Sequence, residues 1–162
     1  MNIAEFQKVS NKQFNNDLSN LGYKIDNQYS FVCLPTRATT GSAGYDFVTP
    51  VDITIKPNEM VKIPSGIRCK IDNGYVLSLY PRSSLGIKKN ITLANTVGII
   101  DSDYYNADNE GHIIIALVNN GNSDVVLKAK ERIVQGIFTK YYLANEEEVT
   151  GVRTGGIGSS DK

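Results

Sequence analysis

The chain has 162 residues, of which 41% are hydrophobic and 21% charged, with 17 basic and 17 acidic side chains. These values are typical of one soluble globular domain with a sizeable core. Zero net charge argues against a broad electrostatic surface for nucleic acid or an acidic membrane. No apolar run approaches the roughly 18 residues of a membrane span, and the first residues lack the pattern of a secretion signal. We therefore expect a cytoplasmic protein without a nucleic-acid or membrane partner.

The two cysteines, Cys33 and Cys69, lie far apart, each beside apolar or alternating residues. We expect both to be small buried side chains and not a disulfide pair. His112 is the one histidine of the chain. A metal site built from cysteine and histidine is therefore nearly excluded.

Residues 1–28 are polar and rich in asparagine. Ser10 and Gln13 have the spacing of a capping box. An apolar stripe at helical spacing is formed by Phe14, Leu18 and Leu21. Gly22 is a typical residue to end a helix. This segment is predicted to be an extension that contains one short helix.

From Tyr29 onward, short runs of strand-forming residues recur, with turn residues between them. The runs are 29–34, 51–55, 60–63, 66–71, 75–80, 91–93, 113–118, 125–127 and 133–138. In 51–55 and 67–71 apolar and polar residues alternate, as they do in a strand with one face on a core. Many short strands at this spacing predict an all-β sandwich, barrel or jelly roll.

The segment from Asn95 to Tyr104 carries the strongest sign of chemistry. A glycine and two isoleucines deliver Asp101 to the end of a predicted strand, and Asp103 and Tyr104 follow at once. A carboxylate held rigidly there can act as a general base toward water. The alternative is an ordinary Asp-Ser-Asp turn, and this segment taken alone favours that alternative.

A candidate anion site follows the predicted strand 75–80, in Pro81-Arg-Ser-Ser-Leu-Gly86. Arg82, the hydroxyls of Ser83 and Ser84, and a tight backbone at Gly86 would form a cradle for an oxyanion or phosphate. The alternative is an ordinary loop with an N-cap serine.

Two polar residues on predicted strands are candidates to support that site. Asp46 can orient an arginine such as Arg82, or can be a surface residue beside a glycine turn. Gln135 lies in a predicted core strand, where an unpaired amide costs about 1–3 kcal/mol. A ligand phosphate or an inter-strand hydrogen bond could each satisfy it.

The last segment, 146–162, is charged at first and then rich in glycine and serine, which favours a flexible tail. Arg153 is followed there by backbone donors at Gly155, Gly156, Gly158 and Ser159. Such a tail could close over a polyphosphate. Simple disorder is the alternative.

Together, five segments in this order resemble the trimeric dUTPase family. They are Ala43-Gly-Tyr-Asp-Phe47, Pro81 to Gly86, Asn95 to Tyr104, Glu131-Arg-Ile-Val-Gln135, and Arg153 to Ser159. The resemblance implies a dUTPase-like jelly-roll β-barrel over 1–145, with 1–28 as its extension, assembled as a homotrimer. It also implies hydrolysis of dUTP to dUMP and pyrophosphate with Mg²⁺, which limits uracil in DNA and supplies dUMP for thymidylate synthesis.

The resemblance also implies a role for each matching residue. Asp101 activates the water that attacks the α-phosphorus. Tyr104 packs under the deoxyribose and leaves no room for a 2′-hydroxyl. Asn95 and the hairpin backbone around Gly98 read the edge of the uracil.

The remaining matching residues are implied to bind phosphate. The α- and β-phosphates are held by Arg82, Ser83, Ser84, Gly86 and Gln135, with Asp46 behind them. The γ-phosphate is covered by the tail of a neighbouring subunit through Arg153, Gly155, Gly156, Gly158 and Ser159. Mg²⁺ is held by the phosphates and water, so the resemblance implies no protein ligand for it.

The chain departs from the family pattern in three places. Ile157 stands where relatives usually have an aromatic that stacks on the base, an interaction worth about 1–3 kcal/mol, and the spacing from Arg153 to the glycines is one residue short. Tyr105 is a candidate replacement ring. The stretch 105–112 is longer than the usual turn, and residues 1–28 exceed the usual core. Such additions occur in relatives from Gram-positive bacteria and their phages.

Two alternatives to this interpretation remain open. A dCTP deaminase shares the fold, but that family has a second arginine where this chain has Leu85-Gly86-Ile87, and its glutamate base has no match here. A phage-type regulatory role would add a protein partner, which would bind at 105–112 and at the N-terminal extension.

Overall fold

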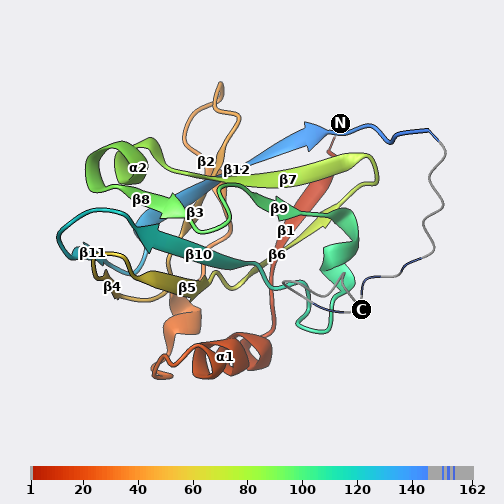
Figure 1. Ribbon diagram of the computed structural model, residues 1–162. Helices are drawn as coiled ribbons and strands as arrows, with labels where there is room; N and C mark the ends of the chain where they lie inside the picture. The colour runs from red at the N-terminus through yellow and green to blue at the C-terminus, as the bar shows by residue number, and fades with distance from the viewer. Residues whose placement is uncertain (1, 146–150, 152, 154, 156–162) are drawn as a thin grey trace.

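The computed structural model describes residues 2–145, 151, 153 and 155. Within these residues the chain forms twelve β-strands, two α-helices and two short 3₁₀ helices (Figure 1). The predicted β-rich fold is thereby confirmed. The longer helix has ten residues, and in the described part of the chain no helix is long and apolar enough to cross a membrane.

The largest sheet has five antiparallel strands and carries most of the predicted site. Its order is β2 (Thr36–Arg37), β3 (Tyr45–Val48), β12 (Arg132–Lys140), β7 (Tyr75–Pro81) and β9 (Gly98–Ile100). A three-stranded sheet faces it, in the order β5 (Met60–Pro64), β10 (Ile114–Asn119) and β8 (Ile91–Leu93) (Figure 1). Two further pairs complete the fold, β4 (Ile53–Ile55) with β11 (Val125–Leu127) and β1 (Ala4–Lys8) with β6 (Ile67–Ile71).

The core forms because alternate side chains of these strands point inward. β10 alternates half-buried and buried residues along its whole length, and β4 and β6 bury the isoleucines and the cysteine that alternation predicted. Side chains such as Ile63, Leu77, Ile115 and Ile133 are fully buried. Each buried side chain of this size contributes about 1.5–3 kcal/mol of transfer free energy.

The predicted N-terminal helix is α1 (Asn11–Asn20), and it packs at one end of the sheets (Figure 1). The Ser10 hydroxyl caps it by accepting a hydrogen bond from the amide of Gln13, and Gly22 follows its end with φ of 81°. The buried face of the helix is formed by Phe14 and Leu18. The helix and its start are therefore confirmed.

The second half of the capping box differs from the prediction. The amide of Ser10 donates to Glu110 Oε2 at 2.8 Å, and the Ser10 hydroxyl donates to Glu110 Oε1 at 2.7 Å. Gln13 instead donates to Asp17 at 3.0 Å. A distant loop thus supplies the acidic group that caps α1, as a helix N-terminus favours.

Two predictions near the N-terminus are wrong. Residues 29–34 are not a strand, because the 3₁₀ helix η1 (Gln28–Phe31) starts there and the Tyr29 ring packs on Phe14, with 5.7 Å between centroids. Cys33 is exposed, because the turn that buries Val32 leaves the next side chain outside. Strand β1 lies in the segment that was expected to be only polar and helical, and it pairs with β6.

The stretch after β7 was expected to form a tight loop at Gly86, and this is also wrong. Residues Ser83–Lys89 form helix α2, which places Gly86 in an ordinary helical turn. The strand prediction before Asp101 is confirmed by β9, which leads into the 3₁₀ helix η2 (Ser102–Asn106).

Candidate active site

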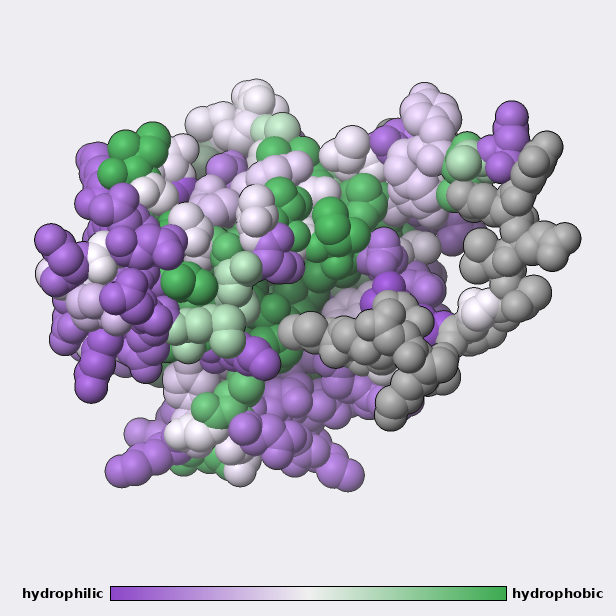
Figure 2. Space-filling view, in the orientation of Figure 1, coloured by the Kyte–Doolittle hydropathy of each residue, from purple (hydrophilic) through white to green (hydrophobic). Residues whose placement is uncertain are grey.

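A cavity of about 450 Å³ lies between β9 and the three-stranded sheet, and we call it the Asp101 pocket. It gathers predicted site residues from distant parts of the chain: Asn95, Gly98, Asp101, Tyr104 and Arg153. Much of its wall is apolar, including Leu79, Leu93, Ile100 and Ile115. Figure 2 shows hydrophobic side chains gathered in this hollow in the middle of the face.

Local backbone structure explains why Asp101 reaches the rim of this pocket. Gly98 opens β9 opposite Leu79, and a Cβ at Gly98 would lie only 3.1 Å from the Cβ of Leu79. The strand ends at Ile100, and Asp101 is the extended residue that precedes η2. The amide of Tyr104 donates to the carbonyl of Asp101 at 3.2 Å, which closes the first turn of η2. The Asp101 carboxylate thus stands on a fixed backbone, with its side chain 45% exposed.

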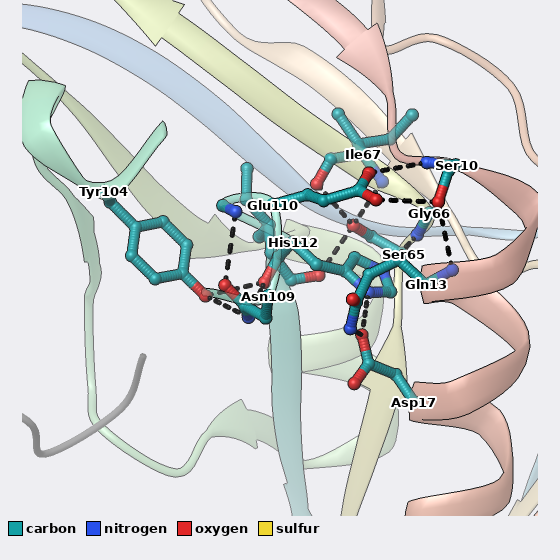
Figure 3. Close-up of polar contacts among 12 residues, drawn as sticks. Ser10, Gln13, Asp17, Ser65, Gly66, Ile67, Tyr104, Asn109, Glu110 and His112 are labelled. Atoms are coloured by element: carbon teal, nitrogen blue, oxygen red, sulfur yellow. Dashed lines mark hydrogen bonds and ion pairs between the residues drawn. The ribbon is translucent and has the colours of Figure 1, made fainter. Parts of the chain in front are cut away.

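Tyr104 lies in η2, three residues after Asp101, and is buried. Its hydroxyl donates to the carbonyl of His112 at 2.7 Å and accepts from Asn109 Nδ2 at 3.0 Å (Figure 3). Burial raises the pKa of Tyr104, although the hydrogen bond from Asn109 opposes the shift. The phenol therefore stays protonated, and its ring is held from behind while it lines the pocket.

Arg153 pairs with both carboxylates of the Asp101 turn. Its Nη2 donates to Asp101 Oδ2 at 2.7 Å, and its Nε lies 3.0 Å from Asp103 Oδ1. Its guanidinium carbon also lies 5.8 Å from the centre of the Tyr104 ring. A planar guanidinium suits such forked contacts with carboxylate or phosphate oxygens. The pair with Asp103 was not predicted.

A second cavity of about 530 Å³, the Arg82 pocket, lies beside β3, β12 and the start of α2. Its lining includes the predicted residues Asp46, Arg82, Ser83, Ser84 and Gln135. Asp46 forms ion pairs with two arginines, with 3.1 Å between its Oδ1 and Arg82 Nε and 3.3 Å between its Oδ2 and Arg132 Nη1. The ion pair between Asp46 and Arg82 that the sequence suggested is therefore present.

Close backbone approach explains the glycine beside Gln135. A Cβ at Gly44 would lie 2.6 Å from Gln135 Oε1 and 3.2 Å from its Cβ, so a side chain there would displace this amide. The Gln135 amide nitrogen lies 3.5 Å from the carbonyl of Pro81. Its oxygen is thus held at the edge of the Arg82 pocket.

Helix α2 gives the Arg82 pocket backbone donors as well as side chains. The amides of Leu85 and Gly86 both donate to the carbonyl of Arg82. The first amides of a helix have no partner within it, so Ser83 and Ser84 can each offer an amide and a hydroxyl to an anion. Gly86 lines neither cavity.

The two pockets share no lining residue. On β7, Leu79 lines the Asp101 pocket, whereas Arg82, just beyond the end of the strand, lines the Arg82 pocket. One chain therefore carries the candidate base and the candidate phosphate cradle on separate surfaces. Gly156, Ile157, Gly158 and Ser159 lie outside the described residues, and Gly155 lines neither pocket.

Tyr105, the candidate replacement for the missing aromatic, lies elsewhere. Its ring stacks on Arg68, with 3.6 Å from the guanidinium carbon to the ring centre, and its hydroxyl donates to Gln7 at 2.7 Å. It does not line the Asp101 pocket. Exposed apolar side chains at the rim of that pocket, Met60 and Ile99, were not predicted as site residues.

The described residues contain no group of three or more His, Cys, Asp or Glu side chains that could form a metal cage. Mg²⁺ is often bound through substrate phosphates and water, with one or two carboxylates at most. Asp101 lines the pocket, and Asp103 lies beside it on the same arginine, so these one or two carboxylates fit an ion of that kind.

Comparisons with known proteins find relatives of this chain. The model of the dUTPase family matches residues 32–161. The chain is 39% identical over 144 residues to the deoxyuridine 5′-triphosphate nucleotidohydrolase of Lactococcus lactis subsp. lactis, covering 86% of this chain and 96% of that protein. The crystal structure of dUTPase from Streptococcus mutans is similar, with 35% identity, a TM-score of 0.69, and coverage of 86% of this chain and 98% of that one.

A phage structure is similar in fold. The Staphylococcus bacteriophage 80alpha dUTPase has a TM-score of 0.69 and covers 95% of this chain and 100% of that one. Its identity to this chain is 17%, so the likeness is one of fold alone.

Proposed function

This chain belongs to the dUTPase family, and we propose that it hydrolyses dUTP to dUMP and pyrophosphate at the Asp101 pocket. Such a reaction limits uracil in DNA and supplies dUMP for thymidylate synthesis. The observation that carries the proposal is the meeting of Asp101, Tyr104 and Arg153 in one largely apolar cavity. This combines a base, a ring for the sugar and a cation for phosphate.

The hydrolytic step needs a base beside the α-phosphorus. Asp101 takes a proton from water, the hydroxide attacks the α-phosphorus, and the bond to the bridging oxygen of pyrophosphate breaks. The carboxylate stands on the rigid junction of β9 and η2 with its side chain partly exposed, so water can reach it. Most of the rate enhancement in phosphoryl transfer comes from such positioning and from charge neutralisation.

The nucleoside part of the substrate lies in the apolar part of the pocket. Tyr104 packs under the deoxyribose, where its buried ring leaves no room for a 2′-hydroxyl. Asn95 and the backbone at Gly98 read the uracil edge. Both residues line the pocket near Asp101, which supports this placement.

The phosphates are bound by cationic and hydroxyl groups. Arg82, Ser83, Ser84 and Gln135 hold the α- and β-phosphates, and Asp46 fixes the direction of the Arg82 guanidinium. Arg153 and the glycines after it close on the γ-phosphate. Mg²⁺, bound by phosphate oxygens and water, would neutralise charge on the phosphate chain when present.

A homotrimer reconciles the two pockets. Because the Asp101 pocket and the Arg82 pocket share no residue on one chain, a complete site forms if the Arg82 pocket of one subunit faces the Asp101 pocket of another. The tail of a third subunit then brings its own Arg153 to the place beside Asp101 that Arg153 of the same chain occupies in this structure. The separation of the pockets supports this arrangement.

The test is pyrophosphate release with Mg²⁺ from dUTP, dCTP, dTTP and UTP. We expect turnover of dUTP alone, and its loss in Asp101→Asn. Asp72→Asn is a matched control, because Asp72 is an exposed carboxylate that lines neither pocket. Turnover that survives in Asp101→Asn would refute the assignment of the base, and ammonia release from dCTP would favour the deaminase alternative.

A regulatory protein partner was predicted to bind at 1–28 and 105–112. These two segments bind each other through Ser10 with Glu110 and through Asp17 with His112. The side chains of Glu110 and His112 are thus occupied within the chain, whereas Asn106 and Asp108 are exposed.

A further inference from the structure

A buried histidine joins helix α1 to the loop that ends the active-site turn. His112 is fully buried, and its Nδ1 lies 2.5 Å from Asp17 Oδ2 on α1. On the other side of the ring, the amide of Gly66 donates to His112 Nε2 at 2.8 Å. Because Nε2 accepts a hydrogen bond, the ring proton is on Nδ1 and is donated to Asp17. Both ring nitrogens are therefore fixed in direction (Figure 3).

The backbone of the same residue holds Tyr104. The carbonyl of His112 accepts the Tyr104 hydroxyl at 2.7 Å and Asn109 Nδ2 at 3.3 Å. Asn109 also donates to the Tyr104 hydroxyl at 3.0 Å. His112 thus connects the Asp17 carboxylate to the phenol of Tyr104. Its ring is hydrogen-bonded to Asp17, and its backbone carbonyl accepts the hydroxyl of Tyr104, which lines the Asp101 pocket.

Helix α1 contacts the loop at a second residue, Glu110, which lies two positions before His112. Glu110 accepts both the amide and the hydroxyl of Ser10, the N-cap of α1. Gly111 lies between these two contact residues. Its φ is 69°, and a Cβ there would lie 2.7 Å from the carbonyl oxygen of Tyr104. The loop therefore has little freedom to move independently of Tyr104.

We propose that Asp17 and His112 are positioning residues that hold the Tyr104 ring in place, so that helix α1 sets how strictly the pocket excludes ribose. This inference rests on the proposed function, in which Tyr104 packs under the deoxyribose. The Tyr104 ring can exclude a single hydroxyl only while its own contacts hold it in place. A small displacement of the ring is enough to make room for that hydroxyl. Loss of the Asp17 contact lets the loop and its carbonyl shift, and the ring then admits a 2′-hydroxyl.

Electrostatics agrees with this path. Burial raises the pKa of Tyr104, and the negative charge of Asp17 raises it further. Asp17 and Tyr104 are therefore close enough to interact, although Asp17 is on a different element.

The test compares dUTP with UTP in Asp17→Ala and in His112→Gln. Alanine removes the acceptor on α1, whereas glutamine can retain the acceptor toward Gly66 but loses the donor toward Asp17, so both variants cut the same contact. We expect each to raise kcat/KM for UTP relative to dUTP by about tenfold, the scale that one steric contact supplies. The double variant should lose no more discrimination between dUTP and UTP than either single variant does. His112→Asn, whose amide can still reach Asp17, should recover most of the discrimination.

A second measurement does not depend on turnover. The Kd values of dUMP and UMP, measured by calorimetry, should move closer together in Asp17→Ala. Two variants serve as controls: Asp108→Asn, an exposed carboxylate in the same loop, and Ile53→Val, a core change in β4 away from both pockets. Ile53→Val should lower Tm without changing the ratio of the Kd values of dUMP and UMP.

The outcomes separate this inference from the proposed function. A wild-type protein that does not hydrolyse dUTP refutes the function itself. A wild-type protein that is active, with variants whose discrimination changes no more than that of the controls, overturns the positioning role even if their Tm falls. If His112→Gln fails to fold, Asp17→Ala still decides the matter, because Asp17 is only partly buried and alanine is a good helix former.

Discussion

Arg153 donates a hydrogen bond to Asp101, with 2.7 Å between Nη2 and Oδ2, although 52 positions separate the two residues. The same guanidinium reaches Asp103 at 3.0 Å. The residue proposed to hold the γ-phosphate and the residue proposed to activate water are thus in direct contact. A triphosphate offers the guanidinium competing oxygens, so binding of substrate would release the base from this pair.

Replacement of Arg153 should affect catalysis far more than folding. We predict that Arg153→Ala lowers kcat/KM for dUTP about a thousandfold, as for arginines that stabilise charge in phosphoryl transfer. Arg153→Lys should recover little, because lysine lacks the planar fork. Partly exposed ion pairs contribute about 0–1 kcal/mol, so the free energy of unfolding should hardly change.

The control for this prediction is Lys128→Ala, which removes another exposed ion pair, with Asp52. It should leave turnover unchanged. Steady-state kinetics and urea unfolding measure the two quantities. Near-normal turnover in Arg153→Ala would show that this arginine does not act on the substrate.

Gly111 should tolerate no side chain. It has a positive φ, and a Cβ there would lie 2.7 Å from the carbonyl oxygen of Tyr104 and 2.8 Å from the Cα of Tyr105, both of them backbone atoms. Gly74 also has a positive φ but has nothing within 4 Å of its Cβ position. We predict that Gly74→Ala costs about 1–2 kcal/mol of unfolding free energy from backbone strain alone. Gly111→Ala should cost clearly more in urea unfolding, and equal losses would mean that the loop around Tyr104 yields easily.

The sequence predicted the elements whose cause is local. The alternation in 67–71, the cap at Ser10 and the strand before Asp101 each depend on neighbouring residues, and the structure has all three. The ion pair of Asp46 with Arg82 could be proposed because both residues belong to recognisable motifs.

The features that sequence reasoning missed depend on distant partners. Strand β1 is polar in composition and becomes a strand because β6 offers it an edge. Glu110 caps a helix about a hundred residues away, and Asp17 meets His112 across 95 positions. Tyr105 could have served as a lid by its type, but Arg68 and Gln7 hold it elsewhere. No local pattern encodes such pairings.

Acid should weaken the contact between α1 and the loop. Burial disfavours the charge of Asp17, but hydrogen bonds from His112 and Gln13 outweigh it and lower the pKa of this carboxyl below 3.8. The folded state thus stabilises the charged form of Asp17 relative to the unfolded state. The resulting stability is complete above about pH 5 and is lost as the pH falls through the folded pKa.

The measurement is the difference in unfolding free energy between wild type and Asp17→Asn across this range. We predict a difference that is constant near neutral pH and shrinks in acid. A difference that instead grew as the pH fell would mean that the carboxyl is not stabilised in its charged form.

The two cysteines should differ in reactivity. Cys33 is exposed, whereas Cys69 is buried in the core, where burial raises the pKa of its thiol to about 12. Because the thiolate is the reactive form, we predict that a disulfide reagent at mild alkaline pH modifies one thiol in the native protein and both in urea. Cys33→Ser should leave no fast-reacting thiol. Rapid modification of both in the native state would contradict the burial of Cys69.

The most direct test of the proposed chemistry is hydrolysis of dUTP in water enriched in ¹⁸O, with mass analysis of both products. If the water activated by Asp101 attacks the α-phosphorus, the heavy oxygen appears in dUMP and pyrophosphate is unlabelled. Label in pyrophosphate would place the attack on the β-phosphorus and contradict the proposed role of Asp101.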